Sequence, residues 1–569
     1  MRSHNRWLQV FFIGFLVLNG KAAFQPLNKA TLHYNTIYFK EEFIENAGEY
    51  ELLLAPDTLN ASPELKTRKG IPAFLLKDLG WGRKYFWRIN VYDKTNKLLS
   101  AGRWHQFSIV KITARYFEDQ RLQVKTNSEK LNAGGLVCVD RLRTIYDRRG
   151  NARWTIPFID SLVNQRSQVI DLRVSPKNSI TFLTDAGALE TSFAGELLWH
   201  LKTPCVVKSD TIRLVHQLQK TAAGNYMVLG NHRVYRKLPD GTVINEKNRA
   251  VVRLSGVPHL RYEAGIIMEF DKKGNLVWSW DGLSYINEAE LSAAAATDRL
   301  TDQFGEISTF ISDASGNKLY LGFPAHQRIV RIDKKTGRVE NTYGQNNNTD
   351  LQHPARMAMT KNNNLLVFDN SGKDQNDVAE ILELKTDPMP GDKNILWRFA
   401  LNFDALSDGK SGKGGSVAEL SNSSLLVCSG AGGRLFEVNR AGEISWDAFA
   451  EIRTGKDTSW KSSVLNICNF TEELPQYHVL PQLLNSGKPG TFSLVLHNTG
   501  DKADAYSVEV IADKKKTVYT SKTKSLPGNS KQALEIVLKD LPSGNKKIIA
   551  RVKSLTTGQT EEITISQKG

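Results

Sequence analysis

Two histidines beside polar turns are the residues of this 569-residue chain best suited to chemistry. His216 precedes the turn sequence 223–225 (Ala-Gly-Asn), and His353 stands between Gln352 and Pro354. Imidazole can transfer a proton near neutral pH, although a histidine at the start of a strand can equally be a structural hydrogen-bonding group. The sequence shows no metal-ligand spacing, nucleophile elbow or phosphate-binding loop, so we expect neither metal nor cofactor.

A repeated strand–turn–strand unit surrounds these histidines between Cys138 and Phe449. Each unit combines a short apolar strand, a tight polar turn and a second strand that usually ends in tryptophan. Because one such unit cannot bury both of its faces, the array should close into a ring with a central funnel. We therefore expect an all-β chain with a six-bladed β-propeller over residues 120–455. The six units end at Trp154, Trp199, Trp278, Asn341, Trp397 and Trp446.

Four stretches of this region carry a family resemblance: Leu214–Leu229, Ile329–Val339, Gln352–Asn370 and Gly415–Val438. Together they resemble the arylsulfotransferase (aryl-sulfate sulfotransferase) family of exported six-bladed propellers. The resemblance covers roughly residues 200–450 and implies transfer of a sulfuryl group from a phenolic sulfate to a phenol, without a nucleotide donor. An aryl sulfate and a phenol are then the expected small-molecule partners.

The family site uses three histidines and one arginine, and one histidine is transiently sulfated. A neutral imidazole is a good nucleophile at sulfur, and a cation stabilises the charge that develops on the sulfuryl oxygens. The resemblance places the first family histidine at His216, with Gln217 in place of the usual aspartate, and the Gln-His histidine at His353. We therefore expect His353 and His216 to be catalytic, with His353 as the sulfated nucleophile.

The other two family positions differ in residue type. Glu306 stands in the place of the second histidine, and Pro324 or Ala325 in the place of the arginine. His326 or Arg328 could supply part of the missing role, so Glu306, His326 and Arg328 are assigned to substrate binding. The competing interpretation is a non-catalytic envelope propeller that binds a glycan, an anionic ligand or a partner protein.

Strand-like runs also flank the propeller region. Tyr50–Leu54 and Tyr85–Tyr92 predict a fibronectin type III-like sandwich over residues 24–112. Phe492–His497 and Tyr506–Val510 predict an immunoglobulin-like sandwich over residues 483–569. The polar, proline-containing segment 456–482 is expected to be a linker.

The first 22 residues are expected to be a secretory signal peptide. Basic residues precede the apolar run Leu8–Leu18, which is short for a membrane span, and Gly20 and Ala22 suit the cleavage positions. An uncleaved anchor is the alternative. We expect an exported protein, periplasmic, cell-surface or secreted, that does not span the membrane after cleavage; its oligomeric state is left open.

The net charge of +15 does not indicate nucleic-acid binding, because the basic residues are spread along polar strand faces and no recognition motif occurs. An anionic small molecule, a polysaccharide or the envelope surface suits this charge, as does a solubilising role. Among the four cysteines, Cys138 and Cys428 are predicted to be buried free thiols. Pairing of Cys205 with Cys468 is left open.

Overall fold

The secondary structure is almost entirely β, as expected from the sequence. The computed structural model describes residues 25–56, 63–175, 179–297, 304–344, 351–370, 378–387, 394–401, 414–472, 474, 479–485, 491–500, 502–512, 516–538, 548–556 and 560–565. Within this described part, α1 (Glu288–Ala295) is the single α-helix, and no helix is long and apolar enough to cross a bilayer. The expected signal peptide, residues 1–22, lies outside the described residues.

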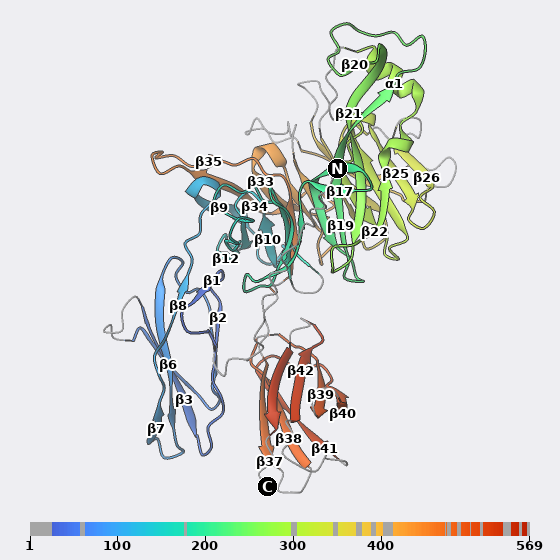
Figure 1. Ribbon diagram of the computed structural model, residues 1–569. Coiled ribbons are helices and arrows are strands. Elements are labelled where there is room, and N and C mark those ends of the chain that lie inside the picture. The colour runs from blue at the N-terminus through green and yellow to red at the C-terminus, as the bar shows by residue number, and fades with distance from the viewer. Residues whose placement is uncertain are drawn as a thin grey trace, which may run out of the picture.

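Two β-rich units flank the middle of the chain (Figure 1). In the first, a sheet with the order β1-β8-β6-β3-β4, and β7 beside β6, accompanies a two-stranded sheet of β2 and β5. In the last, the sheets are β37-β38-β41 and β40-β39-β42-β43. The four strand-like runs predicted here lie in β3, β6, β38 and β39. The strands are β1 (Ala30–Leu32), β2 (Ile37–Lys40), β3 (Glu49–Pro56), β4 (Leu65–Lys69), β5 (Ala73–Leu76), β6 (Lys84–Tyr92), β7 (Leu98–Ala101), β8 (His105–Ile109), β37 (Val479–Asn485), β38 (Thr491–Asn498), β39 (Tyr506–Ala512), β40 (Lys516–Lys522), β41 (Ser530–Val537), β42 (Ile548–Ser554) and β43 (Thr560–Ile565).

Between these units the chain forms successive antiparallel sheets, mostly of four strands in chain order. Their strands are β10 (Leu136–Val139), β11 (Thr144–Asp147) and β12 (Ala152–Thr155); β13 (Ile170–Val174), β14 (Ile180–Thr184), β15 (Gly187–Thr191) and β16 (Leu197–Lys202); β17 (Cys205–Val207), β18 (Asp210–Lys220), β19 (Tyr226–Lys237), β20 (Val251–Leu254), β21 (Val257–Phe270) and β22 (Leu276–Asp281); β23 (Thr309–Ser312), β24 (Lys318–Phe323), β25 (Arg328–Asp333) and β26 (Val339–Gly344); β27 (Pro354–Met359), β28 (Leu365–Asp369), β29 (Glu380–Leu384) and β30 (Ile395–Ala400); β31 (Ser416–Glu419), β32 (Leu425–Cys428), β33 (Arg434–Val438) and β34 (Ile444–Arg453).

The sheets are arranged in a closed, propeller-like ring. Strand β36 (Cys468–Thr471) pairs with β10 and becomes the first strand of that sheet, while β9 (Asp119–Asn127) pairs with β34. The first strands of the sheets contact one another in the cycle β36-β13-β18-β23-β27-β31-β36. The expectation of a linker over 456–482 is wrong for part of this segment, because β36 and β35 (Lys461–Ser462) pair with strands of the ring.

The aromatic residues of the repeat join neighbouring sheets. Five of the six residues that end the sequence units lie in an edge strand of a sheet, in β12, β16, β22, β26 and β30, and Trp446 lies in β34, which also pairs with β9 and β35. The indole N–H of Trp154 donates to the Phe193 carbonyl of the following sheet at 2.9 Å. The indole of Trp446, in the last sheet, donates to the Arg148 carbonyl of the first at 2.7 Å. The predicted packing of these tryptophans between sheets is confirmed, and it continues across the closure of the ring.

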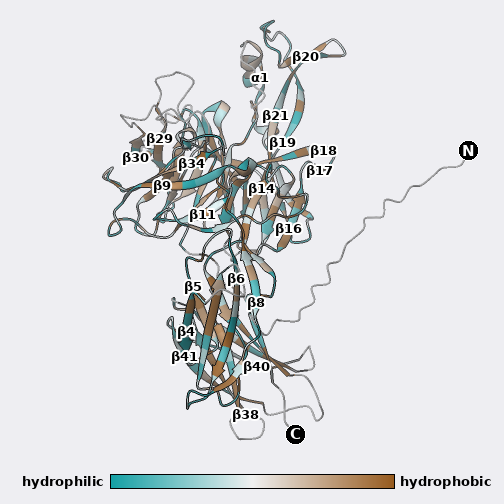
Figure 2. Ribbon diagram, turned by 90° about the vertical axis from the view of Figure 1, so that its left-hand side faces the viewer, coloured by the Kyte–Doolittle hydropathy of each residue, from teal (hydrophilic) through white to brown (hydrophobic). Residues whose placement is uncertain are grey.

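An insertion rises from one sheet of the ring. The hairpin of β19 and β21 extends beyond its neighbours and carries β20 and α1 at its tip, as both ribbon views show (Figures 1 and 2). Helix α1 begins at a capping box in which Asn287 and Glu290 exchange hydrogen bonds. The segment after α1 returns to the ring through a parallel bridge between Gly305 and Ala264. A Cβ on Gly305 would lie 2.7 Å from the Tyr262 ring, so only glycine permits this close approach.

The four cysteines are free thiols. Cys138 and Cys428 are buried, as predicted. Cys205 lies on β17 and Cys468 on β36, where the Cys468 thiol hydrogen-bonds to that of Cys428 instead. Burial raises the pKa of Cys468 well above its usual range, so this thiol stays protonated.

Candidate functional site

His216 and Glu306 form a hydrogen-bonded pair at one end of the ring. The pairing of β18 with β19 shifts register between Val215 and Leu218, and His216 adopts a φ of 58° in this bulge. Its Nε2 atom hydrogen-bonds to Oε1 of Glu306, which precedes β23 on the next sheet. Bulges commonly re-aim side chains beside functional sites, and here the bulge directs an imidazole at a carboxylate 90 residues away.

The surroundings of Glu306 keep it ionised. Burial raises the pKa of this carboxyl, but the hydrogen bond and charge of His216 outweigh burial and bring the pKa below its ordinary value. The Asn231 amide, which donates to Oε1 at 3.2 Å, and the charge of His353 act in the same direction. The structure therefore brings His216, Glu306 and His353 together.

A buried carboxylate fixes the backbone at His353. The N–H groups of Gln352 and His353 donate to the two oxygens of Asp369, at 2.8 Å and 2.5 Å. Burial raises the pKa of Asp369 to about 6, and these two hydrogen bonds oppose that rise. Because Asp369 ends β28 and His353 directly precedes β27, the pair anchors the histidine to its own sheet.

Arg356 is a residue of this site to which the sequence analysis gave no role. Its Nη2 donates to the His216 carbonyl at 2.7 Å, and its Nη1 donates to the Ser308 carbonyl and to Gln217 Oε1, both at 3.1 Å. Burial lowers the pKa of this guanidinium to about 10. Arg356 thus ties three neighbouring sheets together beneath His216. The signal was present in the sequence, because Arg356 closes the Gln-His-Pro-Ala-Arg stretch.

His326 and Arg328 belong to a different cluster. His326 Nε2 donates to the Phe304 carbonyl at 2.8 Å, and its Nδ1 lies 3.5 Å from Glu290 of α1. Arg328 forms an ion pair with Glu290 and stacks on the Tyr285 ring. These contacts hold α1 and the segment before Glu306 against the ring, so the structure does not bring His326 and Arg328 to His216.

The cluster around Glu290 is expected to make the stability of the fold depend on pH in the acid range. Burial raises the pKa of Glu290, but hydrogen bonds and the charges of His326 and Arg328 outweigh it and lower the pKa to about 2. A depressed pKa stabilises the fold above the ordinary value near 4.5, and this stabilisation is lost as the pH falls towards 2. Glu290→Gln should therefore lower the urea midpoint at pH 6, and the difference from wild type should shrink towards pH 3. Glu288→Gln, on the same helix, is the control, and a difference that stays constant with pH would contradict the expectation.

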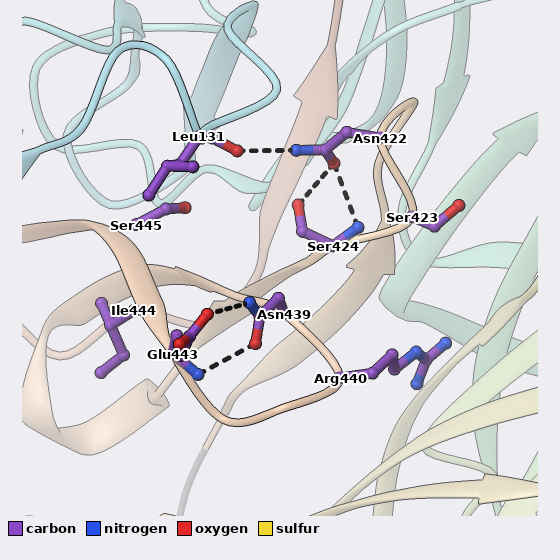
Figure 3. Close-up of a pocket in the computed structure, with 9 residues that line it drawn as sticks. All are labelled: Leu131, Asn422, Ser423, Ser424, Asn439, Arg440, Glu443, Ile444 and Ser445. Atoms are coloured by element: carbon purple, nitrogen blue, oxygen red, sulfur yellow. Dashed lines mark hydrogen bonds between the residues drawn. The ribbon is translucent and has the colours of Figure 1, made fainter.

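A pocket of about 350 Å³ lies at the other end of the sheets (Figure 3). It is formed by the turns that follow β31 and β33. Glu306 and His353 lie at the other end of the sheets, because they come just before the start of β23 and β27. Its polar groups largely satisfy one another: Asn439 donates to Glu443 at 2.7 Å, and Asn422 donates to the Leu131 carbonyl at 3.1 Å. We therefore place the candidate site at His216, Glu306 and His353 and not in this pocket.

Comparisons with known proteins assign no activity to this chain. Neither the protein-family models nor the curated proteins contain a match. A protein of unknown function from Bacteroides caccae is 13% identical, with a TM-score of 0.37, over 62% of this chain and 99% of its own. Regucalcin from Agrobacterium tumefaciens, a calcium-binding protein, is 11% identical, with a TM-score of 0.29, over 60% and 93%. The Cps50 β-propeller domain from Myceliophteria thermophila is 11% identical, with a TM-score of 0.29, over 57% and 88%.

Proposed function

We propose that this chain is an exported arylsulfotransferase-like enzyme built on a six-bladed β-propeller. The cyclic contacts of the first strands and the tryptophan bonds between sheets support the blade count. The flanking units would be the fibronectin III-like and immunoglobulin-like sandwiches. The observation that carries the activity is the His216–Glu306 hydrogen bond beside His353, because it combines a nucleophilic imidazole with an imidazole held by a carboxylate.

In the proposed reaction, His353 attacks the sulfur of an aryl sulfate. The new N–S bond replaces the S–O bond to the aryl group, which leaves as a phenol after taking a proton from His216. The acceptor phenol then attacks the sulfohistidine and gives its proton to His216, so that sulfate ends on the acceptor and both histidines are restored. Glu306 holds Nε2 of His216, which leaves Nδ1 of the same ring for the proton that moves.

A second candidate function is anion or glycan binding without catalysis, and the state of Arg356 favours it. Both Nη atoms of this buried arginine donate to carbonyl oxygens of the protein, so they do not point at a substrate. Glu306 also adds a negative charge where the related enzymes have a histidine, and this charge repels an anionic donor. The same end of the ring would then hold a ligand without transferring sulfate.

A chromogenic aryl sulfate with phenol as acceptor separates the two functions. The wild-type protein should release the chromophore and form phenyl sulfate slowly, and His353→Ala should lower the rate by roughly 10³-fold or more. The thermal midpoint should change little. His259→Ala, on the exposed insertion, is the matched histidine control and should retain the wild-type rate. Equal rates in wild type and His353→Ala, or no transfer in either, would refute the enzyme and favour binding.

A further inference from the structure

Arg143 is a buried cation without a hydrogen-bond partner at its guanidinium end. It lies in the turn between β10 and β11 and is only 2% exposed, yet among the described residues neither Nη1 nor Nη2 has a partner. Its backbone is strained, with a φ of 59°, and is held by a hydrogen bond to the Asp140 carbonyl at 2.9 Å. A buried, unsatisfied guanidinium destabilises a fold, so a group from outside the chain is expected to complete it.

The charge next to Arg143 is also positive. Burial and, to a smaller extent, the positive charge of Arg115 together lower the pKa of Arg143 to about 10. Arg115 lies in the short 3-10 helix η1 (Arg115–Phe117). Its Nε donates to the Arg166 carbonyl at 2.7 Å. Arg143 is therefore exposed to the positive charge of a second arginine, and no carboxylate of the described residues pairs with it, which favours an anion at this place.

Two exposed aromatic rings contact these arginines, and a third, that of Phe117, follows directly in the chain. Tyr116 is 57% exposed, Phe117 71% and Phe158 52%. The Arg115 guanidinium lies 4.8 Å from the centre of the Tyr116 ring, and that of Arg143 lies 5.9 Å from the centre of the Phe158 ring. The N–H of Tyr116 donates to the Gln165 carbonyl at 2.8 Å, which ties η1 to the segment that carries Phe158.

The backbone holds two of these rings in a strained conformation. Tyr116 and Phe117 both have a φ of 59°, a region that aromatic residues rarely adopt. Exposed aromatic rings, a strained backbone and an unpaired cation each lower the stability of the folded chain, so stability does not explain them. They suit a ligand that offers both an apolar face and an anionic group.

We propose that Arg143, Arg115 and the rings of Tyr116, Phe117 and Phe158 form a binding site for an acidic saccharide. The planar guanidinium of Arg143 would pair with the carboxylate of a uronic acid through its two free Nη atoms. Pyranose rings of the same chain would lie on the exposed aromatic faces. The ligand reaches Arg143 by displacing the Phe158 ring. This site is separate from His216 and His353 and does not depend on the proposed transfer of sulfate.

Calorimetry of the full-length protein with a galacturonate tetramer tests this site. Wild type should bind the tetramer, and Arg143→Met should weaken binding about 10- to 100-fold, the loss expected for a hydrogen-bonded charge pair. Arg149→Met is the matched control, because this exposed arginine of the next turn pairs with Glu129. A neutral maltotetraose and inorganic sulfate serve as the ligand controls.

Stability measurements separate a ligand site from a structural role. Without ligand, Arg143→Met should keep or raise the thermal midpoint, because it removes a buried unpaired charge. The tetramer should raise the midpoint of wild type and not that of Arg143→Met. Tyr116→Ala, which changes only an exposed ring, should also weaken binding. No binding by wild type, equal weakening by Arg149→Met, or equally tight binding of sulfate alone would overturn the proposal.

Discussion

Glu306→Gln is expected to lower the rate of sulfuryl transfer by roughly 10³- to 10⁴-fold, the effect known for a carboxylate that holds a catalytic histidine. Glutamine has nearly the same shape but lacks the charge that fixes Nε2 of His216 as the donor. The imidazole would then adopt the other tautomer and present the wrong nitrogen to the proton of the phenol. The loss should appear in kcat more than in KM, because Glu306 orients the histidine that transfers the proton and does not itself hold the substrate.

Stability and a neighbouring carboxylate provide the controls for this variant. The thermal midpoint of Glu306→Gln should stay close to that of wild type. Glu263→Gln removes a carboxylate of the adjacent strand that pairs with Arg233, and it should leave the rate unchanged. A Glu306→Gln protein with the wild-type rate would show that the His216–Glu306 bond has no part in the reaction.

Arg356→Ala is expected to lower the free energy of unfolding by about 3–5 kcal/mol, measured by urea denaturation. The substitution leaves the carbonyls of His216 and Ser308 without this donor inside the ring, and the amide oxygen of Gln217 keeps only its bonds from Thr309 and Phe310. It also removes a side chain that is 9% exposed and leaves a cavity in its place.

Arg149→Ala is the control for this second variant, because its guanidinium pairs at the surface and such pairs contribute little. Its unfolding free energy should stay within about 0.5 kcal/mol of wild type. If Arg356→Ala were as stable as this control, the hydrogen bonds of Arg356 would not be what joins the three sheets.

The repeated sheets could be predicted from sequence because their signals are local. Apolar alternation, polar turns and the closing tryptophan all fall within one unit, and each of the six unit endings lies in a strand of the structure, five of them in an edge strand. The role of β36 could not be predicted in the same way. Cys468 pairs with Val139 far upstream in the chain, and neither strand carries a local mark of this partner.

The candidate site shows the same division. His216 and His353 were found from the motifs around them, and the structure brings them to one end of the ring. The bond between His216 and Glu306 spans 90 residues, so the motif located Glu306 but did not indicate its partner. Arg328 is close in sequence to the position where the family has its arginine. In the structure it forms an ion pair with Glu290 of the insertion, and the spacing of residues in the sequence does not reveal this partner.

The pairing of β36 with β10 has a consequence for how the chain reaches its native state. The first sheet of the ring lacks its inner strand until Thr471 is available, so the ring cannot close on a growing chain that has not reached this residue. Until then the earlier sheets expose edges that invite pairing with other chains. A chain with this order of assembly must be protected from aggregation until its residues up to Thr471 are available.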